Sequence, residues 1–167
     1  MKSVLFIRHA KSSWDDPLMN DFDRTLNERG KKEAPQMAGY LLDRMIPIDS
    51  FISSPAKRAR KTAALFAKEF GFDETLIQLK SELYLPDNTA FIEVIASIPD
   101  TILHPAIFSH NPGITDFVNT LTNQIRVDNI PTAGVFGIKV PDVSWKDFKK
   151  AKKEFWFFDY PKNHGLL

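Results

Sequence analysis

The chain has 167 residues, of which 43% are hydrophobic and 26% charged, the ordinary composition of a globular protein with a sizeable core. Its 22 Lys and Arg side chains nearly balance 21 Asp and Glu side chains, so no strong overall charge favours nucleic acid or a membrane surface as partner. The absence of cysteine excludes disulfides, thiolate nucleophiles and thiolate metal sites.

The first predicted strand covers residues 2–7, where the apolar run Val4–Ile7 changes abruptly to Arg8 and His9. An uninterrupted run of branched and aromatic residues is typical of a strand that is buried on both faces of an α/β sheet. Ligands of such sheets bind beyond the carboxyl ends of the strands. Arg8 and His9 therefore bring an anion-binding side chain and a titratable nitrogen to the expected binding edge.

A polar loop over residues 12–24 follows, with acidic residues Asp15, Asp16, Asp21 and Asp23. These carboxylates have neither EF-hand spacing nor the spacing of paired ligands on a helix, so we expect a solvated loop rather than a divalent-cation site. Residues 26–45 are predicted to form a helix with Asn27 as its N-cap. Pro35 lies inside this segment and should kink or shorten the helix.

A second buried strand is predicted over residues 49–53, directly before another helix. Ser54 is expected to cap this helix, with Pro55 as its first residue. Arg58 then lies about one turn into the helix, near an N-terminus that already favours anions. This strand end therefore brings a second guanidinium to the same expected edge.

Residues 77–87 indicate an edge strand that runs into a loop, and residues 89–97 indicate a short amphipathic helix. A third buried strand is predicted over residues 105–109. His110 follows it directly, just before the N-terminus of a further helix. A second histidine is thus expected at a strand end.

Two more strands are predicted over residues 135–140 and 155–160, whereas the Lys-rich connection 143–153 has no pattern that favours one conformation. Alternation of buried strands with helices predicts a three-layer α/β/α sandwich with a mostly parallel sheet, in which the three buried strands are adjacent. We find no repeat or linker and expect a single domain over residues 1–167. Without a signal-like N-terminus or an apolar run of membrane-spanning length, the expected location is the cytoplasm.

Three strand-end loops thus deliver Arg8 with His9, Arg58, and His110. Two guanidinium groups can bind a phosphoryl group bidentately and stay charged at any working pH. A neutral imidazole can attack phosphorus and form a phosphohistidine, and a second imidazole can stabilise charge in the transition state. Because permanent cations form this clamp, we expect a phosphoryl-transfer site that needs no metal or other cofactor.

These residues also carry a resemblance to a known family. The motifs Arg8-His9-Ala10, Ser54-Pro55-Ala56-Lys57-Arg58-Ala59 and Ser109-His110-Asn111-Pro112-Gly113 together resemble the histidine phosphatase superfamily, which includes the phosphoglycerate mutases. The fuller pattern is similar to the small SixA-like phosphohistidine phosphatases and includes residues 8–14, 23–27, 82–84 and 161–162. The resemblance covers nearly the whole chain and keeps the motifs in order.

The resemblance implies a phosphoglycerate mutase-like fold, with His9 as the nucleophile and Arg8, Arg58 and His110 as the phosphate pocket. One departure is Ala10, because the commoner superfamily signature has Gly after the first histidine. The smaller branch also shows this change.

A second departure concerns the general acid, because no Glu lies in a mutase-like context. Glu82 and Asp87 are the candidates, and each could instead be a surface carboxylate. A phosphohistidine substrate reduces the need for a general acid, since an imidazole nitrogen leaves more readily than an alkoxide. The chain also has no room for the large cap insertions of the family's small-molecule phosphatases.

The sequence therefore predicts a phosphatase that acts on phosphohistidine of another protein, with neither nucleic acid nor membrane as partner. Three alternatives stay open at this point. The first is a phosphomonoesterase that acts on small phosphate esters or on phospho-Ser or phospho-Thr. The second is a non-catalytic phosphate-binding module, although binding alone needs the arginines and not both histidines. The third is a metal hydrolase built on His9, His110 and the acidic loop.

Overall fold

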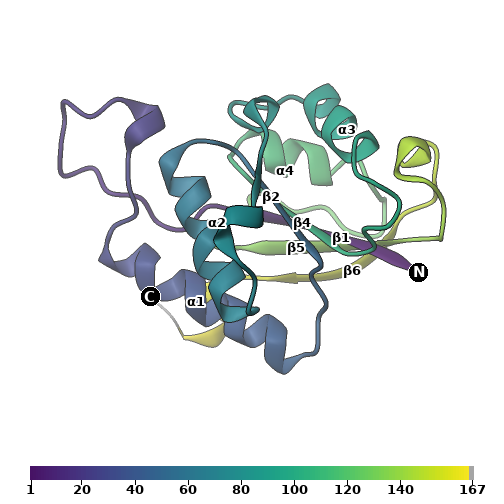
Figure 1. Ribbon diagram of the computed structural model, residues 1–167, viewed down its shortest axis with the longest axis horizontal. Coiled ribbons are helices and arrows are strands. Elements are labelled where there is room, and N and C mark those ends of the chain that lie inside the picture. Colours follow the sequence, from purple (N-terminus) through teal and green to yellow (C-terminus); the bar gives the residue numbers. More distant parts are fainter. Residues whose placement is uncertain (166–167) are drawn as a thin grey trace.

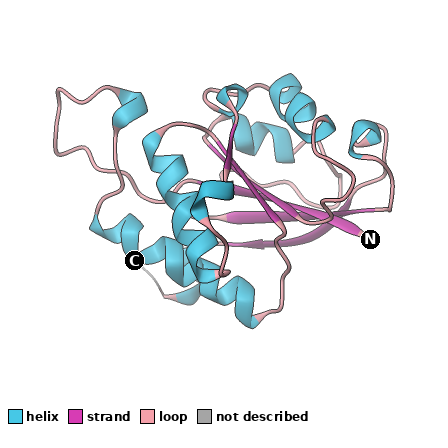
Figure 2. Cartoon of the chain, in the orientation of Figure 1, coloured by secondary structure: helices cyan, strands magenta, loops and turns pink. Residues whose placement is uncertain are grey.

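The computed structural model describes residues 1–165 of the chain, with helices packed around a central sheet (Figures 1 and 2). The strands and α-helices are β1 (Lys2–Arg8), α1 (Glu28–Asp43), β2 (Ser50–Ser53), α2 (Lys57–Glu69), β3 (Gln78–Leu79), α3 (Asn88–Ala96), β4 (Pro105–Ser109), α4 (Gly113–Val118), β5 (Val135–Val140) and β6 (Glu154–Asp159). Short 3-10 helices are η1 (Asp21–Asp23), η2 (Glu74–Leu76), η3 (Ser81–Leu83), η4 (Trp145–Asp147) and η5 (Pro161–His164). Within residues 1–165, no helix combines the length and the apolar character needed to cross a bilayer.

The six strands form one sheet in the order β3-β2-β4-β1-β5-β6. Strand β5 is antiparallel to both of its neighbours and the other pairs are parallel, so five strands run in one direction. Arg8 pairs with Ser109, and Ser53 pairs with Phe108. The predicted adjacency of the three buried strands and the mostly parallel α/β/α architecture are therefore confirmed.

Alternation along β1 divides the core into two halves. Val4 and Phe6 pack into a cluster with side chains of α3 and α4, whereas Leu5 and Ile7 pack into a second cluster with α1 and α2. Figure 1 shows the two pairs of helices on opposite faces of the sheet. Because both faces are covered, the strand must be apolar throughout, which explains its uninterrupted run of apolar residues.

Helix α1 confirms the predicted cap, because the Asn27 side chain accepts a hydrogen bond of 2.8 Å from the Gly30 N–H. Pro35 lies inside the helix, but the helix continues to Asp43, so the expected shortening does not occur. The lost backbone hydrogen bond is one of many in a 16-residue helix, and burial of Ala34, on the apolar face, stabilises the segment around the proline.

The predicted start of α2 is wrong. The helix begins at Lys57 with Ala56 as its N-cap, and no side chain caps it. The Ser54 hydroxyl instead lies 2.7 Å from His110 Nε2 and accepts a hydrogen bond of 3.2 Å from the Ala56 N–H. The backbone of Ala56 is still non-helical, with φ −57° and ψ 138°, so the helix begins at Lys57 and not at Pro55.

Two other segments contain little regular structure. Residues 77–87, expected to be an edge strand that runs into a loop, contain only the two-residue β3, and η3 begins after Lys80. The connection 143–153 contains η4, whose Trp145 is buried and donates an indole hydrogen bond of 2.7 Å to the Ile102 carbonyl. A buried side chain therefore fixes a segment that has no sequence periodicity.

Candidate active site

The carboxyl ends of β1 and β4 bring His9 and His110 together. Because Arg8 and Ser109 are register partners, the next residue of each strand lies at the same edge of the sheet. The His9 N–H donates to the Ser109 carbonyl at 3.2 Å, and the two imidazole ring centroids are 5.2 Å apart. Both rings are buried, and this spacing allows one small anion to contact both.

The hydrogen bonds of His9 determine which ring nitrogen is free. Its Nδ1 lies 2.8 Å from the Ala10 carbonyl oxygen, which can only accept, so a neutral ring carries its proton on Nδ1. Its Nε2 then has a lone pair and accepts a hydrogen bond of 3.3 Å from Arg58 Nε. Burial, followed by the charges around the ring, lowers the pKa of His9 to about 3, although the bond to Ala10 opposes this shift. The imidazole is therefore neutral at physiological pH.

Arg58 lies in the first turns of α2, with its side chain buried against His9. Besides its bond to His9, the guanidinium donates from Nη1 to the Asp21 backbone carbonyl at 2.6 Å and from Nη2 to Asp21 Oδ2 at 3.0 Å. Thr62, one turn further along α2, donates to the Arg58 carbonyl at 2.8 Å and accepts from the Ala10 N–H at 2.9 Å. These bonds fix α2 against the loop that follows β1.

His110 has a different environment. Its Nε2 lies 2.7 Å from the Ser54 hydroxyl, and its buried Nδ1 has no hydrogen-bond partner among residues 1–165. The Tyr84 ring packs against the imidazole edge-to-face, with centroids 5.5 Å apart. Burial first, and then the charge of Arg58, lower the pKa of His110 to about 3. This ring is therefore also neutral and has one nitrogen available to a ligand.

Arg8, the last residue of β1, completes the positive group. It donates to the Ile130 carbonyl at 3.0 Å, and its buried Nε has no partner within the described part of the chain. Burial, and then the neighbouring Arg58, lower the pKa of Arg8. Two neighbouring guanidinium groups repel one another, and this repulsion favours the binding of an anion beside them. The four residues predicted for the phosphate pocket thus lie at one edge of the sheet.

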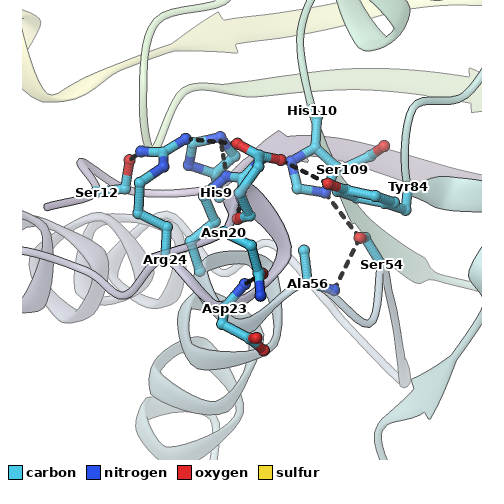
Figure 3. A network of polar contacts seen from close by, with 12 residues as sticks. His9, Ser12, Asn20, Asp23, Arg24, Ser54, Ala56, Tyr84, Ser109 and His110 are labelled. Atoms are coloured by element: carbon cyan, nitrogen blue, oxygen red, sulfur yellow. Dashed lines mark hydrogen bonds and ion pairs between the residues drawn. The ribbon is translucent and has the colours of Figure 1, made fainter. Parts of the chain in front are cut away.

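The site also includes residues that the sequence did not identify as part of it. Asp21 of the acidic loop accepts hydrogen bonds from the Tyr84 hydroxyl at 2.6 Å and from Arg24 Nη2 at 3.1 Å, in addition to those from Arg58. Arg24 also donates to the Ser12 hydroxyl. Figure 3 shows Ser12, Arg24 and Tyr84 around the two histidines. The motif at residues 23–27 pointed to this part of the loop, but nothing in the spacing linked Asp21 to Arg58.

The two candidate general acids, Glu82 and Asp87, form their hydrogen bonds with residues other than the two histidines and two arginines of the site. Glu82 is exposed on η3 and accepts from the Ser81 hydroxyl at 3.0 Å. Asp87 accepts from the Ala90 N–H at 2.8 Å and caps α3. Neither carboxylate forms a hydrogen bond or ion pair with His9 in the described structure. In the same residues 1–165, no group of three or more His, Cys, Asp or Glu side chains could hold a metal ion.

The chain is similar to several known proteins. A family model described as the histidine phosphatase superfamily (branch 1) matches residues 4–84. A candidate phosphohistidine phosphatase, SixA from Agrobacterium tumefaciens, is 27% identical and has a TM-score of 0.78, over 96% of this chain and 98% of that chain. A protein histidine phosphatase SixA complexed with tungstate shares the fold, with a TM-score of 0.83 at 18% identity, over 97% of this chain and 99% of that chain. A mycobacterial glucosyl-3-phosphoglycerate phosphatase complexed with VO3 has a TM-score of 0.69 at 14% identity, over 96% of this chain and 100% of that chain.

Proposed function

The chain belongs to the histidine phosphatase superfamily, and from this premise we propose that it hydrolyses phosphohistidine of another protein through an intermediate on its own His9. The observation that carries the proposal is the hydrogen bond between His9 Nδ1 and the Ala10 carbonyl. It holds the ring by one nitrogen and leaves the other unprotonated beside Arg58, as a nucleophile requires.

In the first step, His9 Nε2 attacks the phosphorus atom of the substrate. The new N–P bond forms as the P–N bond of the substrate phosphohistidine breaks, and the leaving imidazole takes up a proton from solvent. The water that attacks in the second step returns one proton to solvent. Charge builds up on the equatorial oxygens, where Arg8 and Arg58 stabilise it. If the Ser54 hydroxyl donates its hydrogen to His110 Nε2, His110 carries its own proton on Nδ1 and can donate it to a phosphoryl oxygen.

In the second step, water attacks the phosphorus atom of phospho-His9 and the ring leaves as a neutral imidazole with its proton on Nδ1. Inorganic phosphate is released, and the original hydrogen bond to the Ala10 carbonyl persists throughout. This backbone acceptor keeps the ring orientation constant in both steps, so His9 does not have to reorient between them. Permanent cations carry the charge stabilisation, so we propose that turnover needs no metal.

Two observations favour a phosphohistidine over a phosphate ester as substrate. Glu82 and Asp87 are both engaged away from His9, so neither carboxylate is in place to protonate an alkoxide leaving group. An imidazole leaving group depends less than an alkoxide on protonation by a general acid. The sequence similarity to a candidate phosphohistidine phosphatase supports the same substrate class, whereas the structural match to the sugar-phosphate phosphatase rests on the fold alone.

The test is a comparison of kcat/KM on a histidine-phosphorylated protein and on generic phosphomonoesters, each with and without EDTA. We expect kcat/KM to be highest on the phosphohistidine protein and unchanged by the chelator. Faster turnover of small esters or of phosphoserine would show that the proposed substrate class is wrong. Loss of activity in EDTA would show that the enzyme depends on a metal. Phosphate binding without turnover of any substrate would indicate a binding module.

A further inference from the structure

In the structure, the edge of Arg58 that should bind a phosphoryl group is already occupied. Its Nε donates to His9 Nε2 at 3.3 Å, and Nη2, on the same edge of the guanidinium, donates to Asp21 Oδ2 at 3.0 Å. Arginine binds phosphoryl oxygens bidentately through such a pair of nitrogens. A phosphoryl group attached to His9 Nε2 would therefore place an oxygen where the Asp21 carboxylate now lies.

Asp21 is held in this position by more than Arg58. Tyr84 donates to the same Oδ2 at 2.6 Å, and Arg24 donates to Oδ1 at 3.1 Å. Burial opposes ionisation, but these hydrogen bonds, first from Tyr84 and then from the two arginines, outweigh it and hold the pKa of Asp21 well below its usual range. The group is therefore a full negative charge at neutral pH, as a phosphate oxygen is.

The loop that carries Asp21 contributes no side chain of residues 15–23 to the buried core, although Arg58 Nη1 also donates to its backbone at the Asp21 carbonyl. Its base is closed by a 2.7 Å hydrogen bond from the Ser13 N–H to the Thr25 carbonyl, next to an isolated bridge between Ser12 and Leu26. Beyond this base, residues 15–23 are exposed, and Figure 1 shows the loop projecting away from the sheet and helices. The Asp21 side chain itself is 48% exposed, against 6% for Arg58.

We propose that Asp21 is a built-in competitor of the phosphoryl group, which occupies Arg58 in the empty site and withdraws when the phosphoryl group binds. Its return then helps to displace inorganic phosphate after hydrolysis. The inference rests on the proposed function only in taking the pocket of His9 and Arg58 as the phosphoryl site. An alternative role for Asp21 is to position Arg58, and the two roles predict opposite effects on phosphate binding.

The experiment is isothermal titration of the wild-type chain and of Asp21→Asn with inorganic phosphate. Asp21→Asn removes the partly exposed ion pair with Arg58 and the negative charge that would repel phosphate. The Kd for phosphate should therefore fall about fivefold. Asp23→Asn is the matched control, because it removes the same charge from the same loop and the Asp23 side chain forms no hydrogen bond or ion pair within residues 1–165. We expect its Kd for phosphate to stay near that of the wild type.

Equal or weaker phosphate binding by Asp21→Asn would overturn the proposal and assign Asp21 a positioning role. Equal tightening by Asp23→Asn would also overturn it, because a general change in loop charge would then be the cause. Asp21→Ser is measured in parallel, with thermal unfolding of every variant, so that a folding defect in one variant does not decide the outcome. Since the titration involves no turnover, it tests this inference even if His9 proves not to be the nucleophile.

Discussion

The carboxyl ends of β1 and β4 place a histidine at equivalent positions of two neighbouring parallel strands, yet the two rings are held in different ways. His9 is fixed by a backbone carbonyl, which dictates its tautomer and leaves Nε2 as a pure acceptor. His110 is held by the Ser54 hydroxyl, which can donate or accept, and its Nδ1 has no partner in residues 1–165. We propose that the same side chain is thus prepared as a nucleophile at one strand end and as a hydrogen-bond donor at the other.

This difference shows that the partner of a histidine, rather than its position in the sheet, defines its chemistry. A carbonyl acceptor excludes one tautomer of a neutral ring, whereas a hydroxyl permits both. Register pairing alone would make the two histidines interchangeable. The following experiments test the distinction between the two histidines.

The largest effect is expected for His9→Ala, because it removes the proposed nucleophile. Turnover should fall by roughly 10⁴-fold or more, while the chain stays folded. Rapid-quench labelling with a radioactive phosphorylated substrate, followed by peptide mapping, should place the label on His9 of the wild type. His104→Ala is the control, since His104 bonds Ser3 away from the site. Substantial turnover by His9→Ala, or label on another residue, would show that the nucleophile is misassigned.

His110→Ala should have a smaller effect, because it removes a donor and not the nucleophile. We expect kcat/KM to fall by roughly 10²–10³-fold, the cost of one donor that stabilises the transition state. The labelled peptide should still be the one that contains His9, at a slower rate of formation. A variant that loses labelling completely while retaining its fold would contradict the proposed division of roles.

A smaller loss is expected for Ser54→Ala, which leaves both histidines in place but removes the hydroxyl beside His110. Without this partner the ring can rotate or change tautomer, and kcat should fall by roughly 10-fold while KM changes less. Ser81→Ala is a suitable comparison, because the Ser81 hydroxyl bonds only to the exposed Glu82 side chain. Unchanged kcat in Ser54→Ala would mean that Ser54 does not orient His110.

The smallest expected effect is a change in the pH dependence of stability. Both rings have a pKa of about 3 in the folded chain against an ordinary value of 6.5, so between these values the unfolded chain binds more protons. The free energy of unfolding should therefore fall as the pH falls below 6.5, by roughly 1 kcal/mol per ring between pH 7 and 5.5.

Urea unfolding at both pH values tests this expectation. The double variant His9→Asn/His110→Asn should lose less stability on acidification than the wild type, because it lacks both depressed groups. An equal loss in the two proteins would show that the rings are not buried in the neutral form.

Several features of the fold and the site could be predicted because they depend on local pattern. The apolar runs of β1 and β4 predicted buried strands, and the change to His9 and His110 after them predicted which residues lie at the binding edge. The start of α2 could not be predicted in the same way. Ser54 has the sequence of a helix cap, and its hydroxyl does accept from the Ala56 N–H, but the non-helical backbone of Ala56 moves the helix start to Lys57. Local propensity also does not include the contact of Ser54 with His110, which lies 56 residues away.

Sequence alone determined the three buried strands, their adjacency and the identity of the cationic and imidazole side chains, because each depends on neighbouring residues and on general rules for parallel sheets. The tertiary structure decided the rest. Three contacts determine the tautomer of His9, the partner of His110 and the position of Asp21 on Arg58. The contact of Arg58 with Asp21 joins residues that are 37 positions apart, and the contact of His110 with Ser54 joins residues that are 56 positions apart. Long-range contacts of this kind have no periodicity in the sequence, so they become visible only when the packed sheet brings the loops together.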